Sequence, residues 1–258
     1  MANKYYIGLD QGTTGITTLL LDEKWNAVVR GYKEIHQIYP AAGWVEHDAE
    51  EIWESACETV SMVLREGNVT AEDTIACIGL DHEGESVVLW DKETGIPVYN
   101  AVIWQDRRTS QVADQLKENY QDMILEKTGL IVDAYFSATK IEWILQNVPI
   151  CDSLLTSRRL LAGNMDAWML YKMTGGAAHK TDASTASRTM LYNIRTLQWD
   201  SRLCDYFGIP ASMLPQVKPS SADYGTVCIQ GRQIPICGVA GDQQAALFGQ
   251  ACFREGDV

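Results

Sequence analysis

An apolar segment that ends on a carboxylate, residues 5–10, is the feature that most constrains the fold of this chain. A short polar loop follows at residues 11–14, and residues 15–22 form a second apolar run rich in β-branched side chains. Two apolar runs joined by a few residues that include glycine predict a β-hairpin. The chain is therefore expected to begin with an antiparallel strand pair.

The loop of this hairpin has a composition that suits phosphate binding. Gly12, directly after Gln11, lets the backbone approach an anion closely, while backbone N–H groups and the hydroxyls of Thr13 and Thr14 can donate to phosphate oxygens. Asp10, at the end of the strand, is a candidate ligand for a hard cation such as Mg²⁺. An ordinary turn that uses the same polar residues is the alternative, and this stretch alone favours it slightly.

Composition narrows the classes of partner. The formal net charge of -13, with a pI near 4.7 and no run of basic residues, argues against nucleic acid and anionic membranes as partners. No apolar run is long enough to span a bilayer. The seven cysteines show no zinc-like spacing, which together with the absence of a signal-peptide pattern predicts reduced thiols in the cytoplasm, most of them in the core.

The next segments predict a sheet with helices. Residues 27–32 read as the third strand of a meander. Asp48 is a candidate N-cap, with Glu51 three positions later as its capping-box partner, for a helix that ends at Gly67.

A second unit of strand, polar loop and strand follows. Residues 75–81 are almost continuously apolar, which predicts a strand buried on both faces, and residues 86–91 predict a return strand. The polar loop between them, 82–85, is expected to lie beside loop 11–14, since α/β folds bind ligands where strands end.

The rest of the chain alternates helical and polar segments. Residues 102–109 resemble a strand that meets a polar cluster, in which Arg107 and Arg108 are most simply explained as solvated surface charges. Residues 179–193 predict a polar loop that borders a ligand. Helices are expected at about 109–120, from about 140, at 163–171 and at 200–207.

An apolar strand at 234–240 runs into a helix that begins near Asp242, where the carboxylate is placed as an N-cap. Neither a repeat nor a linker-like segment interrupts the chain, so we predict one domain over residues 1–258. The sequence stops without a closing element, as at a domain edge.

In order and spacing, these segments resemble the amino-terminal domain of the FGGY carbohydrate kinases, and among them the glycerol kinases. The resemblance covers essentially the whole chain. It rests on the motifs at residues 8–14, 43–48, 90–95, 104–109, 135–143, 181–182, 186–191 and 240–246.

The resemblance implies an α/β fold of the ribonuclease-H-like, actin-like ATPase type, a mixed sheet with flanking helices. It implies transfer of the ATP γ-phosphoryl group to a hydroxyl of a small polyol or sugar, with Mg²⁺, in a cleft shared with a carboxy-terminal domain that this chain lacks and that holds the adenosine. Homo-oligomers of the full-length protein are compatible with it.

The resemblance also assigns roles to residues of this sequence. Asp10 acts through Mg²⁺, Thr13 and Thr14 contact phosphate together with Gln11 and Gly12 of the same loop, and Asp242 takes the hydroxyl proton. The substrate pocket is implied to comprise Gly84, Glu85, Trp104, Tyr135, Asp242 and Gln243.

Two positions depart from the glycerol kinase pattern. Gly84 and Thr17 stand where that pattern has arginines. A charge-assisted hydrogen bond contributes about 1.5–3 kcal/mol, and glycine leaves volume free. We therefore predict that a larger or differently substituted polyol or sugar, and not glycerol, is the best substrate. The loss of a phosphate-binding arginine at Thr17 is a milder departure.

Two other function classes compete with a kinase. A non-catalytic sensor of polyols or sugars fits the missing arginines, although Asp10, Glu85 and Asp242 are all present. A phosphatase with Asp10 as nucleophile needs a second carboxylate two residues later, where Gly12 stands. We set the phosphatase aside.

Overall fold

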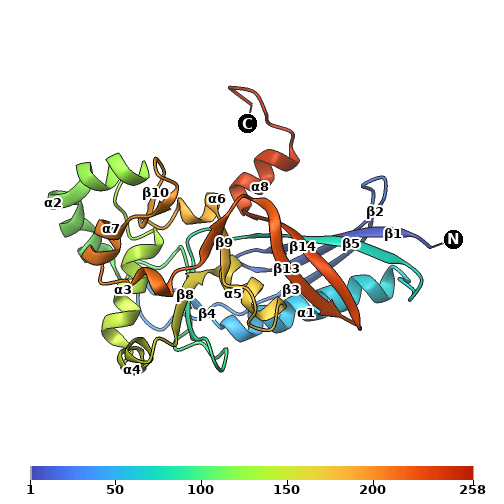
Figure 1. Ribbon diagram of the computed structural model, residues 1–258, viewed down its shortest axis with the longest axis horizontal. Coiled ribbons are helices and arrows are strands. Elements are labelled where there is room, and N and C mark those ends of the chain that lie inside the picture. Colours follow the sequence, from blue (N-terminus) through green and yellow to red (C-terminus); the bar gives the residue numbers. More distant parts are fainter. Residues whose placement is uncertain (1, 258) are drawn as a thin grey trace.

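A mixed six-stranded sheet forms the larger part of the molecule in the computed structural model, which describes residues 2–257 (Figure 1). Its strand order is β13-β14-β5-β1-β2-β3. The strands are β1 (Lys4–Gln11), β2 (Gly15–Asp22), β3 (Ala27–Glu34), β5 (Thr74–His82), β13 (Ser221–Ile229) and β14 (Arg232–Gly241).

The opening hairpin and the meander are confirmed, since β1 pairs with β2 and β2 with β3, both antiparallel. β5 lies parallel to β1 on one side and to β14 on the other. In this register Asp10 is the neighbour of Asp81, and Asp81 is the neighbour of Ala240. The carboxyl ends of three strands therefore meet at one edge of the sheet, next to the hairpin loop.

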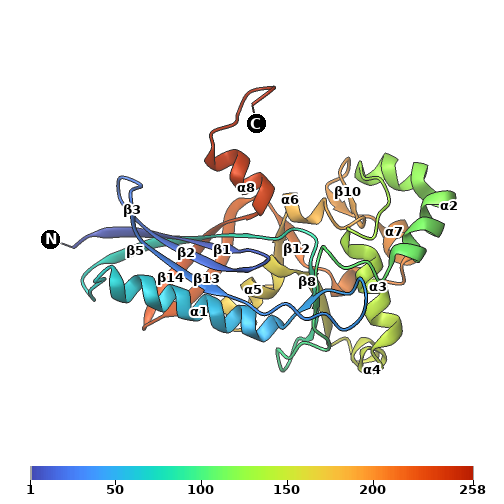
Figure 2. The ribbon, with the colours of Figure 1, turned by 180° about the vertical axis from the view of Figure 1, so that it is seen from behind.

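Helices cover the two faces of this sheet differently. α1 (Ala49–Glu66) and the buried apolar residues of α5 (Met165–Met173) pack on one face, whereas α8 (Asp242–Gly249) lies over the other (Figures 1 and 2). The predicted mixed sheet with flanking helices is thus confirmed.

The start of α1 confirms one prediction and corrects another. The Asp48 carboxylate accepts hydrogen bonds from the backbone N–H groups of Glu50 and Glu51, and Gly67 is the C-cap. The Glu51 side chain does not complete a capping box: it accepts the backbone N–H of His36 and contacts the ring Nδ1 of His36 at 2.6 Å. It fastens the preceding loop instead.

A second, smaller sheet contains β6 (Val87–Asp91), the strand that was expected to return from β5. The order of this sheet is β4-β7-β6-β8, with β4 (Glu46–His47), β7 (Ala101–Val102) and β8 (Leu160–Asn164). The predicted return strand is therefore wrong in its pairing. β1 and β14 already occupy both edges of β5, so the chain crosses to another sheet after His82.

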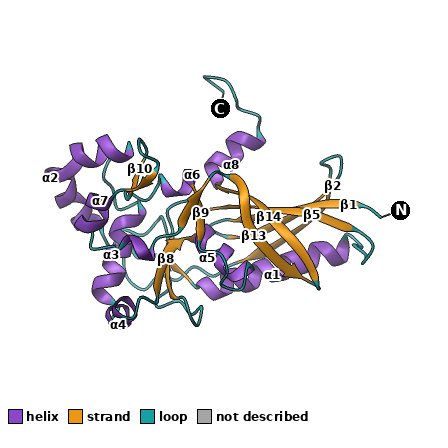
Figure 3. Ribbon diagram, viewed as in Figure 1, coloured by secondary structure: helices purple, strands orange, loops and turns teal. Residues whose placement is uncertain are grey.

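Most of the remaining helices gather at the end of the molecule far from the N-terminus and enclose a second apolar core (Figure 3). They are α2 (Ser110–Thr128), α3 (Ser137–Asn147), α4 (Ile150–Thr156) and α7 (Ser201–Tyr206). The predicted polar loop 179–193 is largely buried, and with the segment that follows it forms short elements. These are β9 (Lys180–Asp182), α6 (Ala183–Ala186), β10 (Tyr192–Asn193), β11 (Gln198–Trp199), η1 (Ala211–Met213) and β12 (Gln216–Lys218).

Cysteine burial differs from expectation. All seven thiols are free, and only Cys151 and Cys204 are buried. Among the described residues, none of the helices combines the length and apolar character needed to cross a membrane.

Arg108 joins the second sheet and the loop after β3 to α3. Its buried guanidinium lies 3.9 Å from the ring centroid of Trp44 and 4.4 Å from that of Trp143. It donates to Glu46 at 2.6 Å and to Asp106 at 2.8 Å, and both carboxylates are buried. The interpretation of Arg108 as a surface charge is wrong, because these partners come from distant segments that the sequence does not show to be close.

We expect Arg108→Ala to lower the free energy of unfolding by about 3–5 kcal/mol, because it leaves two carboxylates buried without a counter-charge. Urea unfolding measures the loss. Arg107→Ala is the matched control, since the neighbouring Arg107 is exposed and pairs with the half-exposed Asp133 at the surface. That variant should change the free energy of unfolding by less than about 1 kcal/mol, and equal losses in both would contradict the role of Arg108.

Candidate active site

The hairpin loop keeps hydrogen-bond donors free. The Gly12 N–H donates to the Gly15 carbonyl at 3.1 Å, which closes the turn. Within the described residues, the backbone N–H groups of Thr13 and Thr14 have no acceptor, and the Thr14 residue is exposed. Two adjacent free N–H groups and a hydroxyl at an exposed turn are the donors that a phosphate group needs.

Other loop residues are used within the protein. The Thr13 hydroxyl accepts the indole N–H of Trp104 and donates to Glu83, both at 2.9 Å. Gln11 is fully buried, and its side-chain N–H₂ contacts the carbonyl of Gly12 at 3.2 Å. The contact between Thr13 and Glu83 confirms that loops 11–14 and 82–85 lie side by side. The burial of Gln11 directs its side chain into the protein, although it was predicted to contact phosphate with the rest of the loop.

Three carboxylates lie together where the parallel strands end. Burial and the charge of Asp242 raise the pKa of Asp10. Burial, followed by the charges of Asp10 and Asp242, raises the pKa of Asp81 to about 7. Sequence analysis missed Asp81, although it occupies the same position at the end of β5 that Asp10 occupies at the end of β1. That repeated strand-end aspartate was the available signal.

This carboxylate edge fits a hard divalent cation held mainly by water and phosphate. Oxygen donors are present, and the raised pKa values report negative charge that a cation would offset. No cluster of three or more potential ligand side chains able to hold a metal forms in residues 2–257. One or two carboxylates, with Asp10 as the first candidate, would be the protein's contribution to such a site, as is usual for Mg²⁺.

A cavity of about 710 Å³ opens between α8 and the second face of the large sheet. Asp10, Asp81 and Thr17 are the polar side chains at its strand-end side, and Leu19, Val239 and Phe248 belong to its apolar wall. Thr17 faces Asp10 across the hairpin. The departure from arginine at Thr17 therefore lies within this cavity, beside the candidate metal ligand.

The predicted pocket residues Trp104, Tyr135 and Glu85 meet at the other side of the loop. The rings of Trp104 and Tyr135 pack edge to face with centroids 5.8 Å apart. Glu85 is buried, and its Oε1 accepts the Nε–H of Arg188 at 2.7 Å. Burial and the nearby Glu85 carboxylate raise the pKa of Tyr135 to about 12, so its hydroxyl stays protonated. An aromatic wall beside a carboxylate suits a polyol, which has C–H faces and hydroxyl donors.

Arg188 was missed as a pocket residue. Its guanidinium lies 5.0 Å from the ring centroid of Phe136, and its Cγ is 3.9 Å from the point where a Cβ on Gly84 would lie. The aliphatic part of the Arg188 side chain therefore lies beside Gly84, where the glycerol kinase pattern has an arginine. The signal lay in the motif 186–191, which was noted as part of the resemblance without a role for its arginine.

Lys140 holds the pocket backbone in place. Its buried ammonium donates to the carbonyls of Phe136 at 3.1 Å and Glu85 at 3.4 Å, and also to that of Tyr135. Burial lowers the pKa of Lys140 to about 7. One side chain thus ties the start of α3 to the loop between β5 and β6 that carries Glu85.

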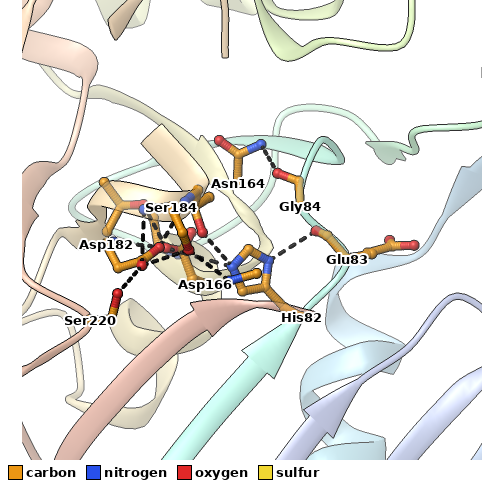
Figure 4. Close-up of polar contacts among 12 residues, drawn as sticks. His82, Glu83, Gly84, Asn164, Asp166, Asp182, Ser184 and Ser220 are labelled. Atoms are coloured by element: carbon orange, nitrogen blue, oxygen red, sulfur yellow. Dashed lines mark hydrogen bonds and ion pairs between the residues drawn. The ribbon is translucent and has the colours of Figure 1, made fainter. Parts of the chain in front are cut away.

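A buried polar network connects the pocket loop with the start of α8 (Figure 4). His82 Nδ1 donates to the Glu83 carbonyl, because a carbonyl can only accept, and Nε2 contacts the Thr185 hydroxyl; both distances are 2.9 Å. Ser184 donates to Asp182 and accepts the backbone N–H of Gly241, the residue before Asp242. These contacts fix Glu83 and Asp242 relative to each other.

Asp242 and Gln243 lie at the exposed start of α8. Gly241 is the N-cap, and Asp242 is the first helical residue, so the predicted N-cap position is off by one. The Asp242 Oδ1 accepts only the neighbouring Gln243 N–H, at 2.7 Å, among the described residues. The carboxylate is thus free to face a ligand.

The mixed sheet with its flanking helices defines an α/β domain of the actin-like ATPase fold. Residues 5–249 match the profile of the FGGY family of carbohydrate kinases, N-terminal domain. The chain belongs to this family.

Named relatives agree with this assignment. The chain is 51% identical over 256 residues to glycerol kinase 2 of Thermotoga maritima, and 50% identical over 257 residues to glycerol kinase of Bacillus cereus. Each match covers 98% of this chain and 51% or 52% of the relative. The chain therefore spans about half the length of these relatives.

Solved structures agree as well. Glycerol kinase of Plasmodium falciparum with ADP superposes with a TM-score of 0.94 at 34% identity, over 99% of this chain and 52% of that one. Xylulose kinase of Rhodospirillum rubrum shares the fold, with a TM-score of 0.87 at 20% identity, over 97% of this chain and 51% of that one.

The carboxylate edge predicts a pH dependence of stability. Between about pH 4 and pH 7, native Asp81 keeps a proton that the unfolded chain releases, so the free energy of unfolding should fall as pH rises through this window. Asp81→Asn should remove this loss and stabilise the protein at pH 8 by about 2 kcal/mol, with little effect near pH 4. Thermal unfolding at both pH values checks it, with the exposed Asp114→Asn as control. A gain of the same size at both pH values would contradict the assignment.

Proposed function

We propose that this domain belongs to an ATP-dependent kinase that phosphorylates a hydroxyl of a small polyol or sugar. The observation that carries the proposal is the hydrogen bond between Trp104 and Thr13. It places the aromatic wall of the pocket directly against the loop with free phosphate donors. A polyol lying on Trp104 would have a hydroxyl within reach of a phosphoryl group on that loop.

Each part of the site then has a role. The N–H groups of Thr13 and Thr14 bind phosphate oxygens, and Asp10 holds Mg²⁺ directly or through water. The metal ion neutralises phosphate charge, which is the main chemical need in phosphoryl transfer. Asp242 accepts the proton of the attacking hydroxyl. The adenosine is bound by a second half like that of the relatives, and this half alone should turn over ATP poorly.

The substrate pocket combines donors, acceptors and aromatic faces. Glu85 accepts hydrogen bonds from substrate hydroxyl groups, and Arg188 donates hydrogen bonds to substrate oxygens. Trp104 and Tyr135 contact the C–H groups of the substrate. The position of Gly84 supports a substrate larger than glycerol, because a Cβ there would make only one ordinary contact, 3.9 Å from Arg188 Cγ. Glycerol remains a weaker substrate in this proposal, since Arg188 supplies part of the missing grip.

A sensor that binds a polyol without phosphorylating it is the second candidate. The absence of guanidinium groups at residues 17 and 84 favours it. The free Asp242 carboxylate and the raised pKa of Asp10 beside it favour the kinase, because both have a direct use in phosphoryl transfer.

The role of Asp242 is testable in a protein that joins this chain to the second half typical of its relatives. Asp242→Asn should lower kcat by at least about 100-fold, because the hydroxyl loses its proton acceptor, while KM for ATP changes little. ATP consumption is the readout, and Asp114→Asn is the control. An unchanged kcat would sink the general-base role, and no turnover of any polyol or sugar by the unmutated protein would favour the sensor.

The substrate preference is tested with glycerol, erythritol, ribitol, xylitol, xylulose, ribulose and gluconate. We expect one of the larger compounds to exceed glycerol about tenfold in kcat/KM. Gly84→Arg should raise the affinity for glycerol about 10- to 100-fold by restoring a charge-assisted hydrogen bond. Gly84→Ala, which adds volume without a donor, is the matched control. If the unmutated protein binds glycerol as tightly as glycerol kinases do, the predicted preference is contradicted.

A further inference from the structure

A chain of hydrogen bonds runs from the substrate pocket through the phosphate loop into the protein interior. The Trp104 indole N–H donates to Thr13 Oγ1 at 2.9 Å, and Thr13 Oγ1 lies 2.9 Å from Glu83 Oε2. The directions are fixed by chemistry. An indole N–H only donates, so the single hydroxyl proton of Thr13 goes to the Glu83 carboxyl group.

Glu83 holds this position at an energetic cost. It is 2% exposed, and its Oε1 has no hydrogen-bond partner among the described residues. The nearest basic group is Nδ1 of the buried His47, at 3.7 Å, and both ring nitrogens of His47 and Oε1 of Gln11 are also without partners there. Burial raises the pKa of Glu83. Several buried polar atoms without partners at one place are unusual, and a functional role is a common explanation.

The backbone around Glu83 is held from two sides. The Glu83 N–H donates to the Gln11 carbonyl at 3.1 Å, and its own carbonyl accepts His82 Nδ1–H at 2.9 Å. Figure 4 shows Glu83 at the end of the His82 network with its carboxyl group directed away from that network. The carboxyl group is therefore aimed from a fixed support.

We propose that Glu83 is a positioning residue that sets Thr13 and Trp104 together. By accepting the hydrogen bond of the Thr13 hydroxyl, Glu83 orients the Thr13 oxygen to accept the indole N–H, which fixes the ring that faces the polyol. The same bond turns the hydroxyl away from the cleft, so the loop presents backbone N–H groups to phosphate. The link to polyol and phosphate rests on the proposed function; the positioning of the indole does not.

The first experiment measures the Trp104 indole N–H in this chain by ¹H–¹⁵N NMR. The chain has eight tryptophans, and Trp104→Phe identifies the signal. Glu83→Asp withdraws the carboxyl group by one methylene. It should shift the Trp104 signal and speed its hydrogen exchange about fivefold, although residue 83 does not touch the indole. Glu83→Gln keeps an acceptor oxygen in place and should remain close to the unmutated protein.

Thr18→Val is the matched control for Thr13→Val. Thr18 lies in the same hairpin, and its buried hydroxyl bonds to Thr59 at 2.8 Å, away from Trp104. Thr13→Val should move the Trp104 signal, whereas Thr18→Val should not. An unmoved Trp104 signal in Glu83→Asp would overturn the proposal, as would an equal response to Glu83→Gln and Glu83→Asp.

Kinetics in the two-half protein separate positioning from simple support of the fold. Glu83→Asp should raise KM for both the polyol and ATP about fivefold or more, because Trp104 and the phosphate loop are no longer held in place. Glu83→Gln should keep both KM values close to those of the unmutated protein. A lower kcat with unchanged KM values would indicate only a smaller folded fraction and would overturn the proposal. If the unmutated protein phosphorylates nothing, the proposed function fails, and the NMR result still decides the role of Glu83.

Discussion

The rest of the site depends on the buried ion pairs of the Arg108 guanidinium with Glu46 and Asp106. The guanidinium packs between Trp44 and Trp143 and neutralises Glu46 and Asp106, so it joins the second sheet, α3 and the loop after β3 at one point. The backbone N–H of Val45 also donates to Asp106. Four residues before Arg108 lies Trp104, whose place against Thr13 requires this segment to be fixed. Burying one guanidinium and two carboxylates costs desolvation energy, and the specific geometry of the ion pairs leaves few alternative arrangements of these segments.

Local pattern was enough to predict the first three strands of the large sheet and the start of α1. The hairpin, the meander and α1 follow from alternation of apolar residues, a glycine-containing loop and the cap at Asp48, all of which act over a few residues. The predictions that were wrong depended on distant partners. β6 left the large sheet because β14, far along the chain, occupies the edge of β5. Arg108 is buried because Trp143 and Glu46 reach it.

The candidate site divides in the same way. Motifs identified Asp10, the loop, Glu85, Trp104, Tyr135 and Asp242 as residues of interest, and the structure brings the pocket residues and the loop together. Asp81, Glu83 and Arg188 gain significance only from their neighbours: a carboxylate on the adjacent strand, a threonine 70 positions away and a glutamate 103 positions away. No local pattern reports such distances. The resemblance to a family supplied part of what the residues alone could not.

The strand order of the large sheet has a consequence for synthesis of the chain on the ribosome. β5 is central, yet its parallel neighbour β14 is on the order of 150 residues further along, which takes roughly ten seconds or more to translate at typical elongation rates. During that interval one edge of β5 has no partner strand. The sheet therefore closes late, through contacts of high sequence separation, which form slowly. An unpaired strand edge that persists this long is open to pairing with other chains until residue 241 has emerged.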